Sequence, residues 1–429
     1  MALPGVKTIV KDRFYSVSRQ DTPVGPRICV IGMRNTDDGT GNVADLDVVQ
    51  VTKESDVITA FGEGSQLHKA YKELVAAGAD RIFMVPLPSN TVYNHTTAAL
   101  TSGGNNIFDD AFAAAEVSMP DIIVPWGRGA NSTDWESPAT PEDDDEYGFH
   151  ANNSSTYSSN WAYKIGEKVK EISENTNPCL AVMGIKPFMS YNSTPTTAEA
   201  MTPGNVSAHL ALSGLPDRDA TDVDGDYIWA NIGRYVVVIA AELKPVAYSS
   251  QNFADFGYAN GATTMAAALS RMASYISPVN KTVFNVTRLR YNPTRTQLSN
   301  GTNTGVVDKG VNAITLNFNK VPIFAEGITF APSTSDYTRI STSRIVNEAA
   351  LVVRQVCQKF VGEPSTMQVR NSMETAITSG LRGMQQLGAL LDSDFTVSYI
   401  PSENKALIDL VLSPAFELKT IEVSIAVNL

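Results

Sequence analysis

Apolar residues in the first half of the chain form short continuous runs that alternate with helix-like segments. We read the apolar runs as buried strands, and they occupy residues 27–33, 80–87, 119–127 and 177–187. The segments between them have the spacing and composition of helices, at 54–62, 65–78, 106–118 and 160–173. Strands that alternate with helices predict a mostly parallel sheet with helices on its faces.

The segment 65–78, SQLHKAYKELVAAG, has the strongest helical pattern. Ser65 is placed to cap its N-terminus, and Gly78 stands at the C-terminal cap position. We expect its apolar face to consist of Leu67, Ala70, Tyr71, Leu74 and Val75. On this pattern His68 is an ordinary surface residue of the helix.

The last hundred residues are organised differently. Residues 314–330 form two extended segments, and 341–362 form a long helix with an apolar stripe of Ile345, Ala349, Val352, Val353, Val356 and Phe360. A second helix is predicted over roughly 371–391, with apolar or small residues three and four apart: Met373, Ile377, Leu381, Met384, Gly388 and Leu391. Strands follow at 395–400 and 406–413. This pattern predicts a separate unit of helices and strands.

Both ends of the chain look like extended arms. In the final segment every odd residue is apolar, namely Ile421, Val423, Ile425, Val427 and Leu429. Residues 1–27 are also strand-like, with Val6, Ile9 and Phe14 as candidate contacts and Pro4, Pro23 and Pro26 around them. A strand with an unprotected edge is a template for pairing with another chain.

Charge and composition narrow the class of protein. With 33 Lys and Arg against 45 Asp and Glu, the net charge is −12, which argues against direct binding to nucleic acid. The three cysteines, Cys29, Cys179 and Cys357, lie far apart and are expected to be buried, unreactive thiols. No signal peptide is apparent at the N-terminus, and the longest apolar run is too short to span a membrane. We therefore expect a protein made in a reducing cytosol.

No catalytic, cofactor or metal site emerges from the sequence. The four histidines, His68, His95, His150 and His209, have no metal-ligand spacing, and phosphate-loop and nucleophile motifs are missing. The segment 217–227, DRDATDVDGDY, resembles a calcium loop but lacks its first and last ligands. We favour a solvated turn there over a cation site. The acidic run 142–146 is expected to be solvated, and Trp126, Trp135 and Trp161 to be packing residues.

Several motifs, in this order, resemble the contractile-tail sheath proteins of long-tailed bacteriophages, in particular the Mu-like sheaths. The first is VITAFGEGSQLHKAYKELVAAGADRIFMVPL at 57–87. The second is the long helix at 343–361, followed by EPS, LGALLDSDFTVSY at 387–399 and LVLSPAFELKTIEVSIAVNL at 410–429. Together these segments cover about a third of the chain.

The resemblance implies a structural role without catalysis or cofactor. Sheath subunits form a helical tube around an inner tail tube, and their extended arms add as strands to the sheets of neighbours. It implies self-assembly, partners among tail tube, baseplate and tail terminator proteins, and a place in the virion tail after assembly in the host cytoplasm. Arg370 and Arg382 are candidates for the tube-facing surface, although both are equally well explained as ordinary surface charges.

The expected fold class is α/β, or α+β overall, with four segments. These are an N-terminal arm at 1–27, an outer α/β domain at 28–335, an inner C-terminal domain at 336–412 and a C-terminal arm at 413–429. Residues 21–26 and 413–416 are the expected hinges, and loops 128–156 and 189–225 are expected to face outward. Two alternatives remain, a sheath from a related contractile injection machine and, less favoured, an oligomeric nucleotide-binding enzyme.

Overall fold

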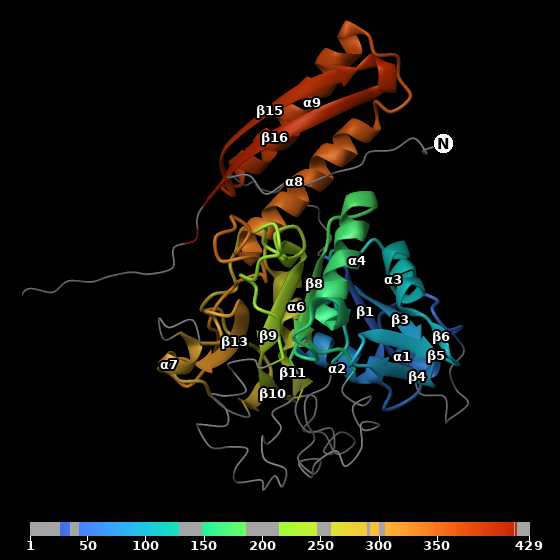
Figure 1. The fold of residues 1–429 in the computed structure, drawn as a ribbon, viewed down its shortest axis with the longest axis vertical. Coiled ribbons are helices and arrows are strands. Elements are labelled where there is room, and N and C mark those ends of the chain that lie inside the picture. Colours follow the sequence, from blue (N-terminus) through green and yellow to red (C-terminus); the bar gives the residue numbers. More distant parts are fainter. Residues whose placement is uncertain are drawn as a thin grey trace, which may run out of the picture.

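A large sheet of eight strands forms the centre of the main body (Figure 1). The computed structural model describes residues 26–34, 43–127, 148–185, 214–246, 259–289, 292–299, 305–415 and 417. The sheet has the order β14-β13-β9-β8-β7-β1-β3-β2, and the six strands from β13 to β3 run parallel. The short outermost strands, β14 and β2, pair antiparallel to their neighbours. The predicted mostly parallel sheet is confirmed.

The described helices and strands have the following bounds. The strands are β1 Ile28–Met33, β2 Val49–Val51, β3 Ile82–Leu87, β4 Thr91–Asn94, β5 Ala99–Ser102, β6 Asn105–Asn106, β7 Ile122–Pro125, β8 Leu180–Gly184, β9 Val236–Ala240, β10 Glu242–Pro245, β11 Ala259–Asn260, β12 Val286–Leu289, β13 Val311–Leu316, β14 Pro322–Phe324, β15 Leu390–Ile400 and β16 Lys405–Pro414. The helices are α1 Glu54–Phe61, α2 Gln66–Ala76, α3 Phe108–Val117, α4 Trp161–Asn175, α6 Gly261–Arg271, α7 Arg295–Leu298, α8 Ile340–Gln358 and α9 Met367–Gln386, with short 3₁₀ turns at Tyr157–Ser159, Gly233–Tyr235 and Pro401–Glu403.

Helices cover both faces of the large sheet because its strands are apolar on both sides. In β1, Cys29 and Ile31 pack with α3 and α4, whereas Ile28 and Val30 pack with α1, α2 and α6. Buried parallel strands need this double cover. Three smaller antiparallel sheets, β11-β10-β12, β4-β5-β6 and β15-β16, complete the described part of the chain.

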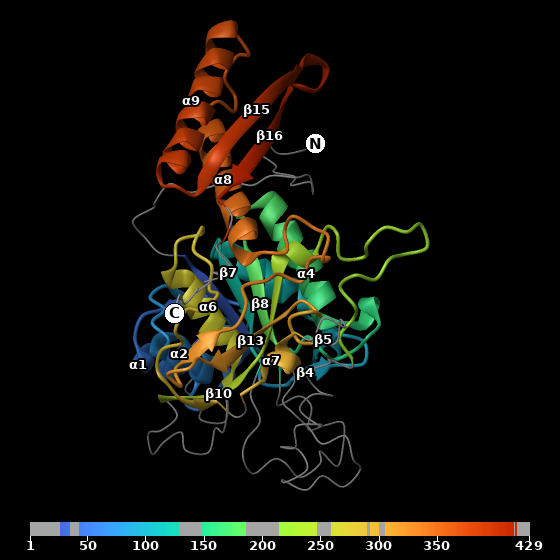
Figure 2. The same ribbon diagram turned by 90° about the vertical axis from the view of Figure 1, so that its left-hand side faces the viewer.

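The C-terminal elements form a third core outside the main body. Figure 2 shows α9 and the hairpin β15–β16 standing clear of the large sheet, with α8 leading up to them. Their apolar side chains gather in a cluster of their own, built on Ile345, Ala349, Ile377, Leu381, Met384 and Leu412. The strand β16 continues through Pro414, two residues into the segment that we assign to the C-terminal arm.

The loop between α1 and α2 explains the FGEGS motif. Gly62 and Gly64 have φ angles of 86° and 75°, which side chains with a Cβ rarely adopt. The Ser65 side chain then accepts a hydrogen bond from the backbone N–H of His68, as the predicted N-cap does. The motif therefore encodes a tight reversal of the chain into a capped helix.

His68 is buried, and its prediction as a surface residue is wrong. Its Nδ1 accepts a hydrogen bond from the backbone N–H of Gly64 at 3.1 Å, and its Nε2 lies 3.1 Å from Glu54 Oε1. Since an amide nitrogen can only donate, Nδ1 carries no proton and the ring is neutral, with Nε2–H donating to Glu54. The apolar stripe of α2 does not reveal this, because the ring faces the loop that precedes its own helix.

Three other expectations are corrected by the structure. Val75 is 45% exposed, so it lies outside the apolar face of α2. The helix α9 ends at Gln386, five residues before the predicted end, and Leu391 is 66% exposed at the start of β15. Within the loop 128–156, residues 149–151 are buried and do not face outward. Phe149 in particular packs edge-on against Trp161.

We predict that the buried imidazole of His68 makes the main body less stable in mild acid. Burial lowers the pKa of His68, with Glu54 opposing part of this effect. The stabilisation by the neutral ring is therefore complete above the unfolded-state pKa of about 6.5 and is lost as the pH falls from there toward the folded-state pKa. Urea unfolding midpoints of the wild type should fall between pH 7.5 and pH 5.5 by more than those of His68→Gln.

The other three histidines are present in both proteins, so the difference between the two pH dependences isolates His68. Equal pH dependences in the wild type and in His68→Gln would contradict the prediction.

Candidate assembly interface

The hairpin β15–β16 has one face on the C-terminal core and one face in solvent. Alternate side chains of both strands turn inward onto α8 and α9, namely Phe395, Val397, Tyr399, Ile408, Leu410 and Leu412. The side chains between them are exposed, and they include Asp392, Asp394 and Thr396. The two strands lie where the sequence predicts them, and their period-2 pattern fixes which face of the hairpin a docking segment would meet.

Both outer edges of the hairpin lack a strand partner in the described part of the chain. The two strands pair with each other over almost their whole length, from Ile400 opposite Lys405 to Leu390 opposite Pro414. No other described strand joins their sheet. Each outer edge therefore presents a row of backbone N–H and C=O groups that a further strand can bind.

The helix α8 is fastened to the main body by polar side chains on its inner face. Arg344 donates hydrogen bonds to the carbonyls of Met272 and Ala273, where α6 ends. Asn347 donates to the carbonyl of Cys179 just before β8 and accepts from Arg234 at 2.8 Å. These bonds hold α8 beside the N-terminal end of β8, a strand in the middle of the large sheet.

Arg354 makes the third attachment, to a helix on the other face of the large sheet. Its guanidinium donates to the carbonyls of Ser173, Glu174 and Thr176 at the C-terminal end of α4. The carbonyl end of a helix carries a partial negative charge, which a cation stabilises. Burial of the guanidinium lowers the pKa of Arg354. Because α4 and α6 lie on opposite faces of the sheet, α8 is clamped to both layers at once.

The clamp by Arg344, Asn347 and Arg354 is not apparent from the sequence. An arginine within an amphipathic helix normally indicates a solvent-facing position, and α8 carries Arg344 and Arg354 among apolar residues. Only the three-dimensional arrangement brings the ends of two other helices to these positions. The two strands of the hairpin, in contrast, are predicted at 395–400 and 406–413 and lie there.

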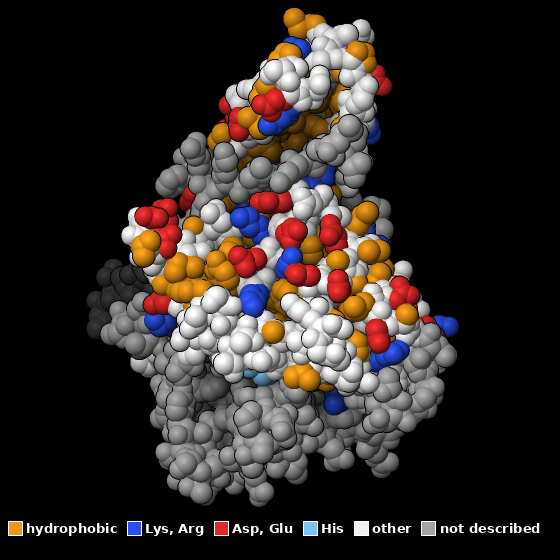
Figure 3. All heavy atoms as spheres, turned by 45° about the vertical axis from the view of Figure 1, so that its right-hand side comes forward, with side chains coloured by type: hydrophobic (Ala, Val, Ile, Leu, Met, Phe, Trp, Pro, Cys, Tyr) orange, Lys and Arg blue, Asp and Glu red, His pale blue; other side chains and the backbone are white. Residues whose placement is uncertain are grey.

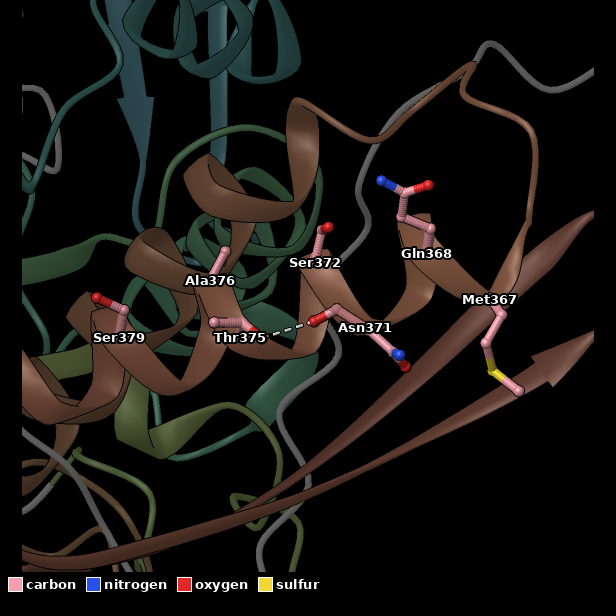
Figure 4. A pocket seen from close by; sticks show the side chains of 7 residues that line it. All are labelled: Met367, Gln368, Asn371, Ser372, Thr375, Ala376 and Ser379. Carbon is pink, nitrogen blue, oxygen red and sulfur yellow. Dashed lines mark hydrogen bonds between the residues drawn. The ribbon is translucent and has the colours of Figure 1, made fainter.

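The exposed face of α9 is almost uncharged. A shallow groove runs along it, and Figure 4 shows its lining side chains projecting from a single helix. They are mostly small or neutral polar residues: Met367, Gln368, Asn371, Ser372, Thr375, Ala376 and Ser379. A neutral polar helix face of this kind suits contact with another protein surface better than binding of a small charged ligand.

The two candidate tube-facing arginines differ in their surroundings. Arg370 lies over the ring of Tyr399, 4.2 Å from its centroid, and its Nε donates to Ser365 at 3.0 Å. Arg382 is exposed one turn before the end of α9. Arg382 is thus free to meet a partner, whereas Arg370 is held against its own hairpin. Which of them contacts a tail tube stays a prediction.

The candidate arm residues fall outside the described part of the chain. These are Val6, Ile9 and Phe14 of the N-terminal arm and Ile421, Val423, Ile425, Val427 and Leu429 of the C-terminal arm. Loop 189–225 is described only from residue 214 onward. There residues 221–227 of the predicted turn are exposed, whereas Leu215 and Arg218 are buried and do not face outward. The Asp222 carboxylate accepts hydrogen bonds from the backbone N–H groups of Asp224 and Asp226.

Reactive groups in the described ranges are buried or dispersed. No cluster of His, Cys, Asp and Glu in these ranges is arranged to hold a metal ion. Burial raises the pKa of Cys29 and of Cys179 to about 12 and that of Cys357 to about 11, which confirms the prediction of buried thiols. Trp126 and Trp161 are buried, as expected of packing residues, and Trp135 lies outside the described residues.

The surface of the described residues carries both signs of charge. On the face shown in Figure 3, acidic and basic side chains are interspersed over the main body. No described helix combines the length and the apolar character needed to cross a membrane.

Solved structures with this fold come from contractile particles, although no protein-family model and no curated protein matches the sequence. The helical sheath of the anti-feeding prophage in its contracted state matches with a TM-score of 0.58 and 13% identity, over 99% of each chain. The contracted sheath of the extracellular contractile injection system PVC gives 0.57 and 12%, over 99% of this chain and 98% of that one.

A sheath tail protein from Listeria innocua matches with a TM-score of 0.56 and 9% identity, over 94% of each chain. At identities this low the likeness concerns the fold. The fold is that of contractile-sheath proteins, as the sequence resemblance predicts, and it extends over nearly the whole chain.

We predict that Arg354 contributes strongly to the stability of the whole chain. Replacing it by Met leaves the buried carbonyls at the end of α4 without their donors, at a cost of about 2–4 kcal/mol. The urea unfolding midpoint should fall accordingly. The matched change Arg382→Met, at an exposed position on α9, should alter stability by no more than about 0.5 kcal/mol. Equal losses in the two variants would contradict the clamp.

Proposed function

We propose that the protein is the subunit of a contractile sheath, which polymerises as a helical tube around an inner tube. The hairpin β15–β16, with two outer edges that no described strand occupies, is the observation that carries the proposal. The fold shared with solved sheath proteins supports it. An edge that is open in one copy and an extended arm on the next form a head-to-tail contact, and such contacts generate open helical assemblies.

Assembly would proceed by strand addition from the arms of neighbouring copies. The odd-numbered face of 421–429 offers five apolar side chains, worth on the order of 10 kcal/mol if fully buried. Ordering nine residues costs a similar amount, about 1–2 kcal/mol per residue. The backbone hydrogen bonds to the hairpin edge, about 0.5–1.5 kcal/mol each, then make the free energy of docking favourable. A single arm would bind modestly, and the many arms of a tube would bind cooperatively.

Contraction would use rotation and sliding of rigid subunits, with the arms as hinges. The expected hinge at 21–26 is kept, whereas that at 413–416 moves beyond Pro414, because Ser413 and Pro414 belong to β16. The clamp by Arg344, Asn347 and Arg354 supports this division, because it fastens the C-terminal unit to the main body through α8. Movement of one copy against another would then leave the two units of each copy in a fixed relation. An extended tube of higher free energy would release that energy on contracting, without a cofactor and without enzymatic activity.

The neutral face of α9, with Arg382 at its end, would contact the inner tube. Baseplate and tail terminator proteins would bind the two ends of the sheath, within a tail assembled in the cytoplasm of the host bacterium.

The structural neighbours include injection systems as well as a sheath tail protein, so a related contractile machine is the second candidate. An oligomeric nucleotide-binding enzyme has no observation in its favour.

We expect that a chain lacking residues 419–429 folds but does not polymerise. The deletion removes the C-terminal arm strand and leaves the core of the C-terminal unit intact. Electron microscopy of the purified wild-type protein should show long hollow tubes, and sedimentation of the truncated chain should show monomers with an unchanged circular dichroism spectrum. Tubes of wild-type length from the truncated chain would overturn strand exchange by this arm.

We also expect that Arg382→Glu weakens binding of the sheath to its tail tube protein. The change reverses the charge at the end of the α9 face while leaving the C-terminal core unaltered. Co-sedimentation of tubes with assembled sheath measures the association. Lys53→Glu, which makes the same charge change at an exposed site of the main body, is the control. Equal association for both variants would remove Arg382 from the tube-facing surface.

A further inference from the structure

The chain that follows β9 forms a basic surface, although the net charge of the whole chain is −12. Asp and Glu are absent from the described segments 243–246, 259–289, 292–299 and 311–325. The cations of these segments, which we call the basic surface, are Lys244, Arg271, Lys281, Arg288, Arg295 and Lys320. In the described part of the chain, Lys244, Lys281 and Lys320 form no ion pair.

Two of these cations form a like-charged pair across neighbouring strands. Lys244 of β10 stands directly opposite Arg288 of β12, so both side chains lie on one face of that small sheet. The next pair, Leu243 and Leu289, packs on the core that α1, α2 and α6 cover. Like charges directly opposite each other destabilise a sheet, and an anionic partner bound to both would remove the repulsion.

Hydrogen bonds bring Lys281 and Lys320 to the same side of the main body. The N–H of Val283 donates to the carbonyl of Pro322 in β14 at 2.8 Å, and the N–H of Phe324 donates to the carbonyl of Lys281 at 3.1 Å. The chain that leads into β12 therefore runs beside β14. Lys320 belongs to the turn that joins β13 to β14, so it lies at the end of this edge.

Exposed phenylalanine rings stand among these cations. Phe318 is 94% exposed at the tip of the β13–β14 connection. Its turn is rigid, because the Asn317 carboxamide oxygen accepts hydrogen bonds from two backbone N–H groups within the turn. Phe284 is 53% exposed, and the guanidinium of Arg271 lies over its ring, 4.8 Å from the centroid. Aromatic side chains that are held in place before binding are typical anchors of protein interfaces.

An acidic turn elsewhere in the main body has the complementary chemistry. Residues 221–227, TDVDGDY, are all exposed, and Val223 at their centre is fully exposed. The turn is closed by a hydrogen bond from the backbone N–H of Asp222 to the carbonyl of Asp226 at 2.8 Å. None of its three carboxylates is in an ion pair within the described ranges. The turn thus presents acids around one apolar side chain.

The turn and the basic surface lie on opposite faces of the large sheet. Leu215 and Trp229, on either side of the turn, pack in the core that α3 and α4 cover. Leu243 and Val283 of the basic segments pack in the other core, under α1, α2 and α6. The sheet therefore separates the two features within one copy. A contact between them joins two copies head to tail, and such contacts generate open assemblies.

We propose that the acidic turn 221–227 of one copy docks on the basic surface of a second copy. The carboxylates of the turn face Lys244 and Lys281, and Val223 packs against the exposed phenylalanine rings. Charge complementarity fixes the orientation of the two copies and opposes the pairing of two like surfaces. The inference goes beyond the proposed function, because this contact between main bodies requires neither terminal arm.

The first test reverses the charges on each side separately and then together. Lys244→Glu with Lys281→Glu should raise the critical concentration for tube formation about tenfold, and Asp224→Lys with Asp226→Lys should do the same. A chain that carries all four changes should return to near the wild-type value. Added salt should raise the wild-type critical concentration and change that of either reversed pair less. Critical concentrations come from sedimentation of tubes over a dilution series.

Lys53→Glu with Lys359→Glu is the matched control, since both residues are exposed and lie outside the basic surface. This control should polymerise like the wild type. Lys244→Glu alone should weaken assembly without lowering the urea unfolding midpoint, because the new carboxylate stands opposite Arg288. Tubes that form equally well with the basic pair reversed, or a fourfold variant that is not rescued, would overturn the charge matching.

The apolar part of the contact is tested by Phe318→Ser. The ring is exposed, so its loss should leave the urea midpoint unchanged, whereas the critical concentration should rise at every salt concentration. Val117→Ser, at another exposed apolar position of the main body, is the control and should assemble like the wild type. Assembly of Phe318→Ser at the wild-type concentration would overturn the docking of the turn on this ring.

A further test asks whether the contact joins two copies. Wild-type chains with natural nitrogen and with ¹⁵N are mixed, allowed to associate and treated with a carbodiimide, which condenses a Lys amine with an Asp carboxylate. Mass spectrometry should find the turn 221–227 of one isotope linked to Lys244 or Lys281 of the other. Links within single chains only, or no link from the turn, would overturn the proposal. A wild type that forms no tubes would instead overturn the proposed function, and the same cross-linking then decides the contact in solution.

Discussion

The arrangement of this molecule depends on one helix whose side chains bind the ends of two others. Arg344 reaches the carbonyl end of α6 and Arg354 that of α4, on opposite faces of the large sheet. Beyond these attachments the same helix contributes Ile345, Ala349 and Val353 to the C-terminal core. Because α8 belongs to both cores, the hairpin and α9 are held in a fixed relation to the main body. Without the clamp they would be joined to it only through the chain.

A second constraint arises from the hairpin itself. Among the described residues, two strands that cover two helices leave both of their outer edges open, and a soluble monomer would normally shield such edges with charge, proline or a covering loop. Here Asp392 and Asp394 give β15 an acidic outer side, which discourages pairing between two identical edges because like charges would face each other.

The sequence predicted what depends on local pattern and missed what depends on distant contacts. The parallel sheet follows from continuous apolar runs, and the long helix at 340–358 follows from its apolar periodicity; both patterns act within each element. His68 and Arg354 look like surface residues in that pattern, because the Gly64 amide and the end of α4 that bind them are set by the fold. Leu391 was assigned to a helix because its spacing continues the stripe of α9, although the turn at Gly388 ends that helix first.

Two buried polar contacts in the described part of the chain respond differently to acid. The joint between the main body and the C-terminal unit relies on guanidinium groups, which stay protonated throughout the pH range in which proteins fold. The junction between α1 and α2 relies on a neutral imidazole, which takes up a proton in mild acid. Mild acid would therefore destabilise the junction between α1 and α2, while the C-terminal unit stays attached to the main body through α8. In any assembly of such subunits, the main body of each copy would lose stability in acid before the attachment of its C-terminal unit did.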